Sequence, residues 1–229
     1  MNAEFDQYAT SYSDLLRDPI RDRFASGAQF FHQRKMALIL SFLARQNISP
    51  EKLSWLDVGC GRGDLLNVGM SRFQRAVGCD PSAKMAEGCA SAEVFTQTSP
   101  TELPFPDSSF DFVTAACVYH HVPRESRPAL TTSICRVLKP NGIFCMLEHN
   151  PWNPVTQLIV KRCPVDQDAD LLSASRALQT MRASNFDVLE TSYFLYFPER
   201  IFNRAGWLEG FLRRCPLGGQ FAVFGRKIV

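Results

Sequence analysis

A glycine-rich turn at residues 56–63 constrains the fold of this chain more than any other feature. Its sequence is LDVGCGRG, so glycines occupy the alternate positions 59, 61 and 63. The apolar residues before it predict a buried strand, and the spacing of Leu65, Leu66, Met70 and Phe73 predicts a helix directly after it. Glycines let a backbone turn sharply and approach a ligand, and free N–H groups at a helix start favour an electron-rich group. The segment therefore predicts a strand–turn–helix unit that binds a ligand.

The spacing of the glycines argues against two other nucleotide-binding patterns. A dinucleotide fingerprint reads G-x-G-x-x-G, whereas this chain has G-x-G-x-G. A P-loop needs Lys followed by Ser or Thr after its last glycine, and Asp64-Leu65 stands there instead. The Tyr-x-x-x-Lys pair of an NAD-dependent oxidoreductase is also missing, because Tyr119, Tyr193 and Tyr196 have no lysine four residues later. A tight turn that binds no ligand is the remaining alternative.

A second strand is predicted at residues 75–80, and it ends in an acidic residue, Asp80. Asp80 follows Asp57 at close to the roughly 20-residue offset at which a strand-end carboxylate meets a ribose diol. The alternative role of Asp80 is to cap the next helix, but Ser82 can fill that position. Asp80 is therefore expected to accept hydrogen bonds from both hydroxyl groups of a ribose.

Strands and helices continue to alternate along the chain, which predicts an α/β fold with a doubly wound, mostly parallel sheet. The further predicted elements are two helices within 1–50, strands at 93–98, 110–117, 143–148, 186–197 and 219–228, and a helix that starts at Asp168 or Asp170.

Four segments of the chain resemble the class I S-adenosylmethionine (SAM) dependent methyltransferases of the type that acts on small molecules. They are the glycine turn, ELPFPDSSFD at 102–111, YHHV at 119–122 and LKPNG at 138–142. The resemblance covers residues 53–150 and implies a Rossmann-like sheet of seven strands with an antiparallel last strand. It implies one domain over 1–229, made of a helical cap (1–50), a SAM-binding core (53–150) and a substrate-side region (151–229).

The same resemblance implies which residues contact the cofactor SAM. The glycine turn holds its amino-acid end, Tyr12 reaches it from the helical cap, and Arg34 pairs with its carboxylate. Many relatives carry an acidic residue for the adenine amino group where this chain has Ser99, so a backbone contact nearby is expected instead. Ordinary core packing is the alternative for Tyr12. The expected cofactor contacts are Tyr12, Arg34, Asp57, Gly59, Gly61, Gly63, Asp80, Pro81, Ser99, Thr101 and Cys117.

Histidines follow the fourth and fifth predicted strands, where the resemblance places the methyl group. An imidazole has a reference pKa near 6.5 and can accept a proton, so His121 and His149 are the expected catalytic bases. Packing and turn hydrogen bonds are the alternative role of the histidine pair. The expected substrate contacts are Tyr119, His120, Glu148 and Trp152. The implied activity is methyl transfer from SAM to a hydroxyl or amine of a small molecule; a catalytically silent SAM-binding or regulatory protein is the alternative.

Composition narrows the partners of the chain. A hydrophobic content of 45% and a charged content of 21% are typical of a globular protein, and a net charge of +2 does not favour nucleic acid. No apolar run is long enough to predict a membrane span. The eight cysteines are scattered without a C-x-x-C pair, so no metal site is predicted and a reduced, cytoplasmic protein is expected. The apolar and arginine-rich segment 198–218 is expected to cover the pocket, to form a homodimer surface or to admit an apolar substrate.

Overall fold

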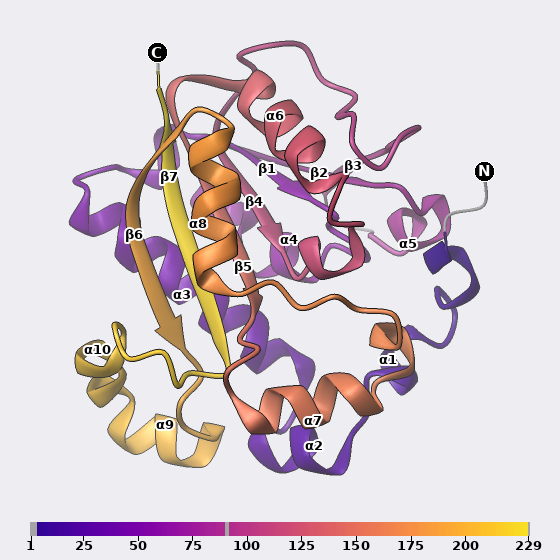
Figure 1. Cartoon of the computed structure of the whole chain (residues 1–229), viewed down its shortest axis with the longest axis vertical. Helices are drawn as coiled ribbons and strands as arrows, with labels where there is room; N and C mark the ends of the chain where they lie inside the picture. The colour runs from indigo at the N-terminus through magenta and orange to yellow at the C-terminus, as the bar shows by residue number, and fades with distance from the viewer. Residues whose placement is uncertain (1–3, 90–91, 229) are drawn as a thin grey trace.

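The computed structural model describes residues 4–89 and 92–228, and its centre is a seven-stranded sheet in the order β3-β2-β1-β4-β5-β7-β6 (Figure 1). The strands are β1 (Ser54–Val58), β2 (Arg75–Asp80), β3 (Glu93–Thr96), β4 (Phe110–Ala116), β5 (Leu138–His149), β6 (Phe186–Phe194) and β7 (Gln220–Lys227). Strands β1 to β5 pair in parallel, whereas β7 runs antiparallel to both of its neighbours, β5 and β6. The predicted fold, a mostly parallel sheet with an antiparallel last strand, is confirmed.

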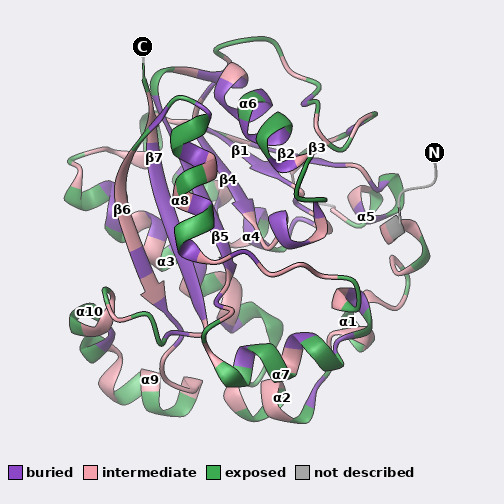
Figure 2. Cartoon of the chain, in the orientation of Figure 1, coloured by how far each residue is buried: buried purple, intermediate pink, exposed green. Residues whose placement is uncertain are grey.

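Helices cover both faces of this sheet (Figure 1). Helices α6 (Arg127–Val137) and α8 (Ala174–Ala183) pack on one face, and α3 (Ala28–Arg45) and α4 (Asp64–Gly69) pack on the other. Successive strand residues point to opposite faces, so Leu56 belongs to the first core cluster and Trp55 to the second. Because both faces are covered, the central strands are almost entirely buried (Figure 2), which explains their continuous apolar sequences.

The chain reverses its direction across the sheet between β3 and β4, and this reversal marks the binding edge. Strands β1, β2 and β3 follow one another outward, and the chain then returns to place β4 on the other side of β1. In open α/β sheets, ligands bind outside the carboxyl ends of the strands at such a reversal. The glycine turn, Asp80 and Cys117 lie at the carboxyl ends of β1, β2 and β4, respectively.

The N-terminal segment is more broken than the two helices that the sequence predicts. The structure has η1 (Glu4–Gln7), α1 (Tyr12–Leu15), α2 (Pro19–Phe24) and α3 there, and residues 1–3 of the predicted cap lie outside the described residues. Asp18 explains one break, because its Oδ1 accepts hydrogen bonds from the N–H groups of Ile20 and Arg21 and so caps α2. Pro19 at the first position of α2 favours the same helix start.

The C-terminal third has one helix that the sequence did not predict and one that begins later than predicted. The unpredicted helix is α7 (Pro154–Arg162), which begins where the Asn153 side chain accepts a hydrogen bond from the Thr156 N–H at 2.9 Å. The helix predicted from Asp168 or Asp170 begins only at Ala174, since Asp170 is paired with two arginines. The remaining short elements are η2 (Pro50–Lys52), η3 (Met70–Arg72), α5 (Ala83–Glu87), η4 (Tyr119–His121) and η5 (Pro164–Asp166).

Segment 198–218 exposes two of its three aromatic side chains, whereas the third, Phe202, packs against the core. It forms α9 (Glu199–Ala205), η6 (Gly206–Leu208) and α10 (Glu209–Leu212), on which Trp207 and Phe211 are 69% and 79% exposed. Of its residues, Pro198 lines the central cavity described below. Ile201, Trp207 and Phe211 of this segment therefore lie on an outer surface of the molecule. None of the helices within the described residues is long and apolar enough to cross a membrane.

Candidate active site

A cavity of about 940 Å³ opens at the carboxyl edge of the sheet, and its size is in the range of sites that enclose small molecules. Elements from the whole length of the chain line it, from the N-terminal segment to β7. The predicted site residues that line this cavity are Tyr12, Asp57, Gly59, Gly61, Asp80, Pro81, Ser99, Cys117, His120, His121 and His149. The fold thus brings most of the predicted site residues to one enclosed space.

The glycine turn presents bare backbone to the cavity. Gly59 and Gly61 have φ angles of 66° and 54°, which lie in the left-handed region that residues with a Cβ rarely adopt. A Cβ atom added to Gly61 would meet nothing closer than the Met85 methyl carbon at 3.5 Å, so the space in front of Gly61 is open. A ligand can therefore lie directly against the peptide groups of the turn.

Asp80 lies at the end of β2 and holds the glycine turn in place. Its Oδ2 accepts a hydrogen bond from the Gly61 N–H and its Oδ1 accepts one from the Ser82 N–H, both at 2.8 Å. Burial raises the pKa of Asp80, and the two N–H donors act in the opposite direction. A carboxylate has about four acceptor positions, so each oxygen keeps one for a further donor. Ser82 caps α5 with its own hydroxyl group, as predicted, which leaves Asp80 facing the cavity.

Asp57 is fixed beside the glycine turn by a chain of buried hydrogen bonds. The Trp55 Nε1 donates to the Thr114 hydroxyl at 2.8 Å, and that hydroxyl donates to Asp57 Oδ1 at 2.6 Å. The carboxyl group is almost inaccessible to solvent, and burial raises its pKa to about 7. The network holds one acidic group at the cavity wall in a single orientation.

The remaining predicted contacts do not line the cavity, and the structure gives the reason for each. Tyr119 and Glu148 are fully buried, because the tyrosine hydroxyl bonds to Thr131 and the glutamate accepts the N–H groups of Val118 and Tyr119. Trp152 is 69% exposed on the outer surface. Gly63 closes the turn by donating its N–H to the Cys60 carbonyl, and Thr101 lies with its hydroxyl 3.3 Å from that of Ser99.

Arg34 also lies outside the cavity, whereas its neighbour Lys35 lines it. Arg34 is engaged in an ion pair with Glu209, and its guanidinium lies 3.6 Å from the centroid of the Phe202 ring. Lys35 is 5% exposed and lines the cavity, where its Nζ lies 3.3 Å from Cys117 Sγ. Of these two adjacent cations on α3, Lys35 is therefore the one that lies at the cavity wall.

Cys117 is a thiol in an unusual environment at the end of β4. Its φ angle of 61° is uncommon for a residue with a side chain. Burial would raise the pKa of the Cys117 thiol, and so would Glu148, but the Lys35 ammonium and His149 together lower it to about 6. The Gln220 amide nitrogen, 3.6 Å from Sγ, adds a neutral donor. These groups favour the thiolate at neutral pH.

The reactivity of Cys117 toward iodoacetamide should follow this low pKa. Because the thiolate is the nucleophile, the rate of Cys117 alkylation should reach half of its maximum near pH 6, well below the range of an ordinary cysteine. Replacing Lys35 by Met removes the nearest cation and should move this midpoint upward. Peptide mass spectrometry after timed alkylation measures each cysteine separately. Cys89 serves as the internal reference, and a Cys117 profile that coincides with it would contradict the assignment.

Three imidazoles meet on the side of the cavity formed by β4 and β5. The ring centroid of His120 lies 4.1 Å from that of His121 and 5.2 Å from that of His149. His120 is buried, which by itself would lower its pKa, but Glu148 and Asp166 outweigh burial and raise that pKa to about 10. Asp166 in η5 lines the cavity as well, and no motif in the sequence had pointed to it.

The N-terminal segment covers part of the cavity through a few polar and aromatic contacts. Phe5 and Tyr12 line the cavity, and the Phe5 ring meets the His121 ring edge-on with centroids 4.9 Å apart. Asp6 accepts a hydrogen bond from the Ser82 hydroxyl at 2.5 Å. Helices α1 and α2 have no buried residue, so this cover is held by contacts with the cavity rim and not by a core of its own.

Residues 56–146, which contain the glycine turn, Asp80 and the histidine pair, match the family model of a methyltransferase domain. They form a class I, SAM-dependent methyltransferase domain. The chain is 33% identical over 109 residues to YcgJ of Bacillus subtilis, described as an uncharacterized methyltransferase, over 44% of this chain and 42% of that protein. It is also 33% identical over 136 residues to the sterol 24-C-methyltransferase ERG6B of Gibberella zeae, over 55% of this chain and 35% of that protein.

A SAM-dependent methyltransferase from Archaeoglobus fulgidus shares the fold of this methyltransferase domain. The TM-score is 0.63 at 18% sequence identity, and the alignment covers 90% of this chain and 97% of that one. The chain spans less than half the length of the two curated relatives named above. The likeness to the solved structure therefore concerns the fold of most of the chain, whereas the likeness in sequence concerns the methyltransferase domain and its surroundings.

SAM is the cofactor of the methyltransferase domain, and the cavity residues suit it. The open backbone at Gly61 leaves room for the amino-acid end of SAM, and the two free acceptor positions of Asp80 match the two hydroxyl groups of its ribose. Lys35 places a buried cation at the cavity wall, where a carboxylate can pair with it. Ser99 and Pro100 line the cavity near the expected adenine position and offer backbone groups to it.

Proposed function

We propose that the chain transfers the methyl group of SAM to a hydroxyl or amine of a small molecule. The observation that carries this proposal is one cavity with two chemically different sides. The glycine turn and Asp80 form the side that suits a nucleoside, and His121 and His149 stand at the ends of β4 and β5 on the other side. A methyl donor held on the first side would thus face proton acceptors on the second.

The cofactor supplies an electrophilic methyl group on a sulfonium, and the protein supplies orientation. Holding an acceptor atom in line with that methyl group can contribute roughly 7–11 kcal/mol in favourable systems. We assign Asp80 to the ribose hydroxyl groups and Lys35, in place of Arg34, to the carboxylate of SAM. Tyr12 comes from the N-terminal cover and lines the same cavity, where it helps to exclude water.

His149 is the base that we favour for removing a proton from a hydroxyl acceptor. Its Nδ1 lies 3.3 Å from the Gln220 amide, whose Oε1 is buried without a hydrogen-bond partner. The amide nitrogen of Gln220 faces both His149 Nδ1 and Cys117 Sγ, so it holds the His149 ring in place at the end of β5. His121 is the second candidate for the base, and its ring contacts Phe5 of the N-terminal cover.

The part of the cavity beyond the histidines suits a small molecule with both polar and apolar groups. Its lining includes Arg21, His32 and Asn153 beside the rings of Phe24 and Phe31. His32 is half-buried with its Nδ1 buried and unpartnered, and desolvation lowers the pKa of its imidazole to about 3, so it stays neutral and can serve as a hydrogen-bonding group. The similarity to a sterol 24-C-methyltransferase makes a carbon acceptor the second candidate.

Calorimetric titration with SAM, S-adenosylhomocysteine and NAD⁺ tests the cofactor part of the proposal. The wild-type chain should bind SAM and S-adenosylhomocysteine, and Asp80→Ala should weaken both by about 1–3 kcal/mol because it removes charged acceptors from the ribose hydroxyls. Asp80→Asn keeps the shape and should lose less. Binding of NAD⁺ without SAM would overturn the proposal, whereas SAM binding without methyl transfer to any acceptor in a broad screen would favour a silent SAM-binding protein.

A further inference from the structure

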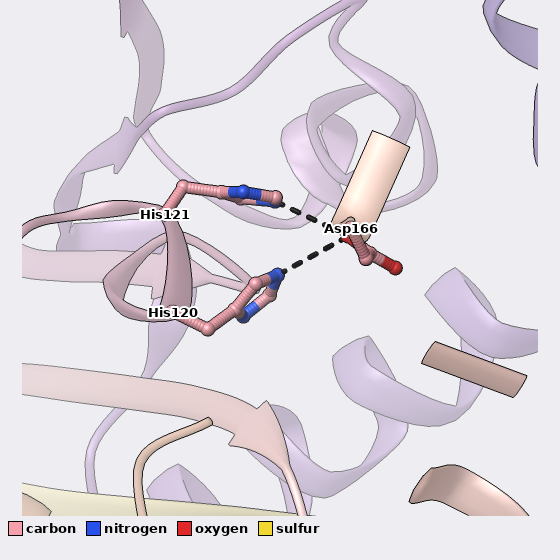
Figure 3. A group of neighbouring side chains, drawn as sticks. All are labelled: His120, His121 and Asp166. Atoms are coloured by element: carbon pink, nitrogen blue, oxygen red, sulfur yellow. Dashed lines mark ion pairs between the residues drawn. The ribbon is translucent and has the colours of Figure 1, made fainter. Parts of the chain in front are cut away.

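Two histidines and an aspartate converge at one point on the cavity wall (Figure 3). His120 and His121 belong to η4, directly after β4, and Asp166 belongs to η5, more than forty residues later. Asp166 Oδ1 lies 3.3 Å from His121 Nε2 and 3.6 Å from His120 Nε2. One ligand atom from each of the three residues lies within 4.8 Å of the other two.

The two distances from Asp166 Oδ1 match the separation of ligands around one metal ion and are longer than those of ordinary hydrogen bonds. Imidazole nitrogens and carboxylate oxygens bind zinc at about 2.0–2.2 Å, so two ligands of a tetrahedral shell lie about 3.3–3.6 Å apart. An N–H···O hydrogen bond has a shorter donor–acceptor distance of about 2.7–3.2 Å. Both Nε2–Oδ1 distances in the cluster fall in the first range.

A buried carboxylate orients the first histidine toward this point. Glu148 Oε2 lies 2.6 Å from His120 Nδ1, so the Nε2 of the same ring is directed at Asp166. Glu148 is itself fixed, because its other oxygen accepts the N–H groups of Val118 and Tyr119 at 3.0 and 2.7 Å. A carboxylate on the far nitrogen of a ligating histidine is typical of protein metal sites, where it sets the tautomer and the ring orientation.

We propose that His120, His121 and Asp166 bind one divalent transition-metal ion, of which zinc is the best match, inside the cavity of the methyltransferase domain. Two imidazoles and one carboxylate form a donor set that suits zinc and its first-row neighbours better than magnesium or calcium, which prefer oxygen ligands. Three protein ligands leave at least one coordination position open, as in catalytic metal sites.

The three ligands line the same cavity as Asp80 and His149, so the open position faces the space proposed for the acceptor. A hydroxyl oxygen bound there would lose its proton more readily, because a divalent cation stabilises the resulting alkoxide. This last role rests on the proposed function, whereas binding of the metal does not depend on it.

Metal titration of the tag-free, chelator-treated chain tests the site. Zn²⁺ followed by calorimetry should bind with one equivalent, and Co²⁺ should give a visible absorption spectrum without a thiolate charge-transfer band. His121→Ala and Asp166→Asn each remove one ligand and should weaken Zn²⁺ binding by at least about 100-fold. Asp168→Asn removes an exposed carboxylate two residues away, and His149→Gln removes a cavity imidazole outside the cluster, so both should keep the affinity of the wild type.

The proposal does not depend on His120→Ala, which could prevent folding by leaving Glu148 buried without its partner. Circular dichroism of the two ligand variants shows whether they remain folded. Weak or non-stoichiometric binding, equal affinity in His121→Ala and Asp166→Asn, or a thiolate band with Co²⁺ would each overturn the site. SAM titration of the same samples reports separately on the cofactor, so failure of the metal site and failure of the proposed methyl transfer give different results.

Discussion

Replacing His149 by Gln should lower the turnover number by about 10²- to 10⁴-fold, the range that a positioned general base contributes. The glutamine fills a similar volume and can still bond to Gln220, but it cannot accept the proton of an acceptor hydroxyl. The affinity for SAM should be largely unchanged, because His149 ends β5, and β4 separates β5 from β1 and the glycine turn. Release of S-adenosylhomocysteine, measured with an acceptor found by screening, gives the rate, and calorimetry gives the affinity.

Chemical rescue separates a catalytic role of His149 from a structural one. Imidazole added to the His149→Gln variant should restore part of the lost rate, because a diffusing base can enter the space left beside the acceptor. A variant that is only misfolded would not respond and would also lose SAM affinity. If His149→Gln turns over at the rate of the wild type, the base is not His149, and His121 becomes the first candidate.

Replacing Glu148 by Ala should reduce the free energy of unfolding by about 3–5 kcal/mol, the effect of breaking a buried ion pair by removing one partner. The Glu148 side chain is completely buried, lies 2.6 Å from His120 Nδ1, and accepts two backbone N–H groups of the turn after β4. The substitution leaves all three donors buried without an acceptor. Urea denaturation followed by circular dichroism measures the change.

Two further variants test whether the loss of stability in Glu148→Ala comes from the buried position of this carboxylate. If it does, removing an exposed carboxylate should have a much smaller effect. Glu148→Gln keeps an acceptor oxygen for the turn and should be less destabilising than Glu148→Ala. Glu93 forms an exposed ion pair with Arg75 at 3.0 Å, so Glu93→Ala should cost no more than about 1 kcal/mol. Equal losses for Glu148→Ala and Glu93→Ala would show that the buried network does not stabilise the fold as described.

Site residues that belong to a local sequence pattern could be predicted. Site residues whose position depends on contacts between distant segments could not. The glycine turn and Asp80 were found because a strand, a turn and a helix follow one another within a few residues. Arg34 and Lys35 are adjacent cations on α3, and only the one whose side chain points into the cavity can contact a ligand there. Lys35 lies on the same helix face as the buried Ile39, four residues later, a signal that helical periodicity contains.

Asp166 and Trp152 show that the sequence pattern did not predict positions that depend on distant segments. Asp166 enters the cavity because α7 and η5 bring it to the histidines, and α7 itself was not predicted. Trp152 sits in a loop that follows β5, but its side chain turns outward and is 69% exposed. Which way a loop side chain points depends on packing between segments far apart in the chain, and a local pattern holds no information about it.

The hydrogen bond between Asp6 and Ser82 links the cover of the cavity to the ribose side of the site. Ser82 donates its backbone N–H to Asp80 and its hydroxyl group to Asp6, so one residue contacts both the cover and the carboxylate expected to hold the ribose. A substitution at Ser82 therefore acts on two parts of the site at once, the contact that holds the N-terminal segment and the carboxylate at the end of β2.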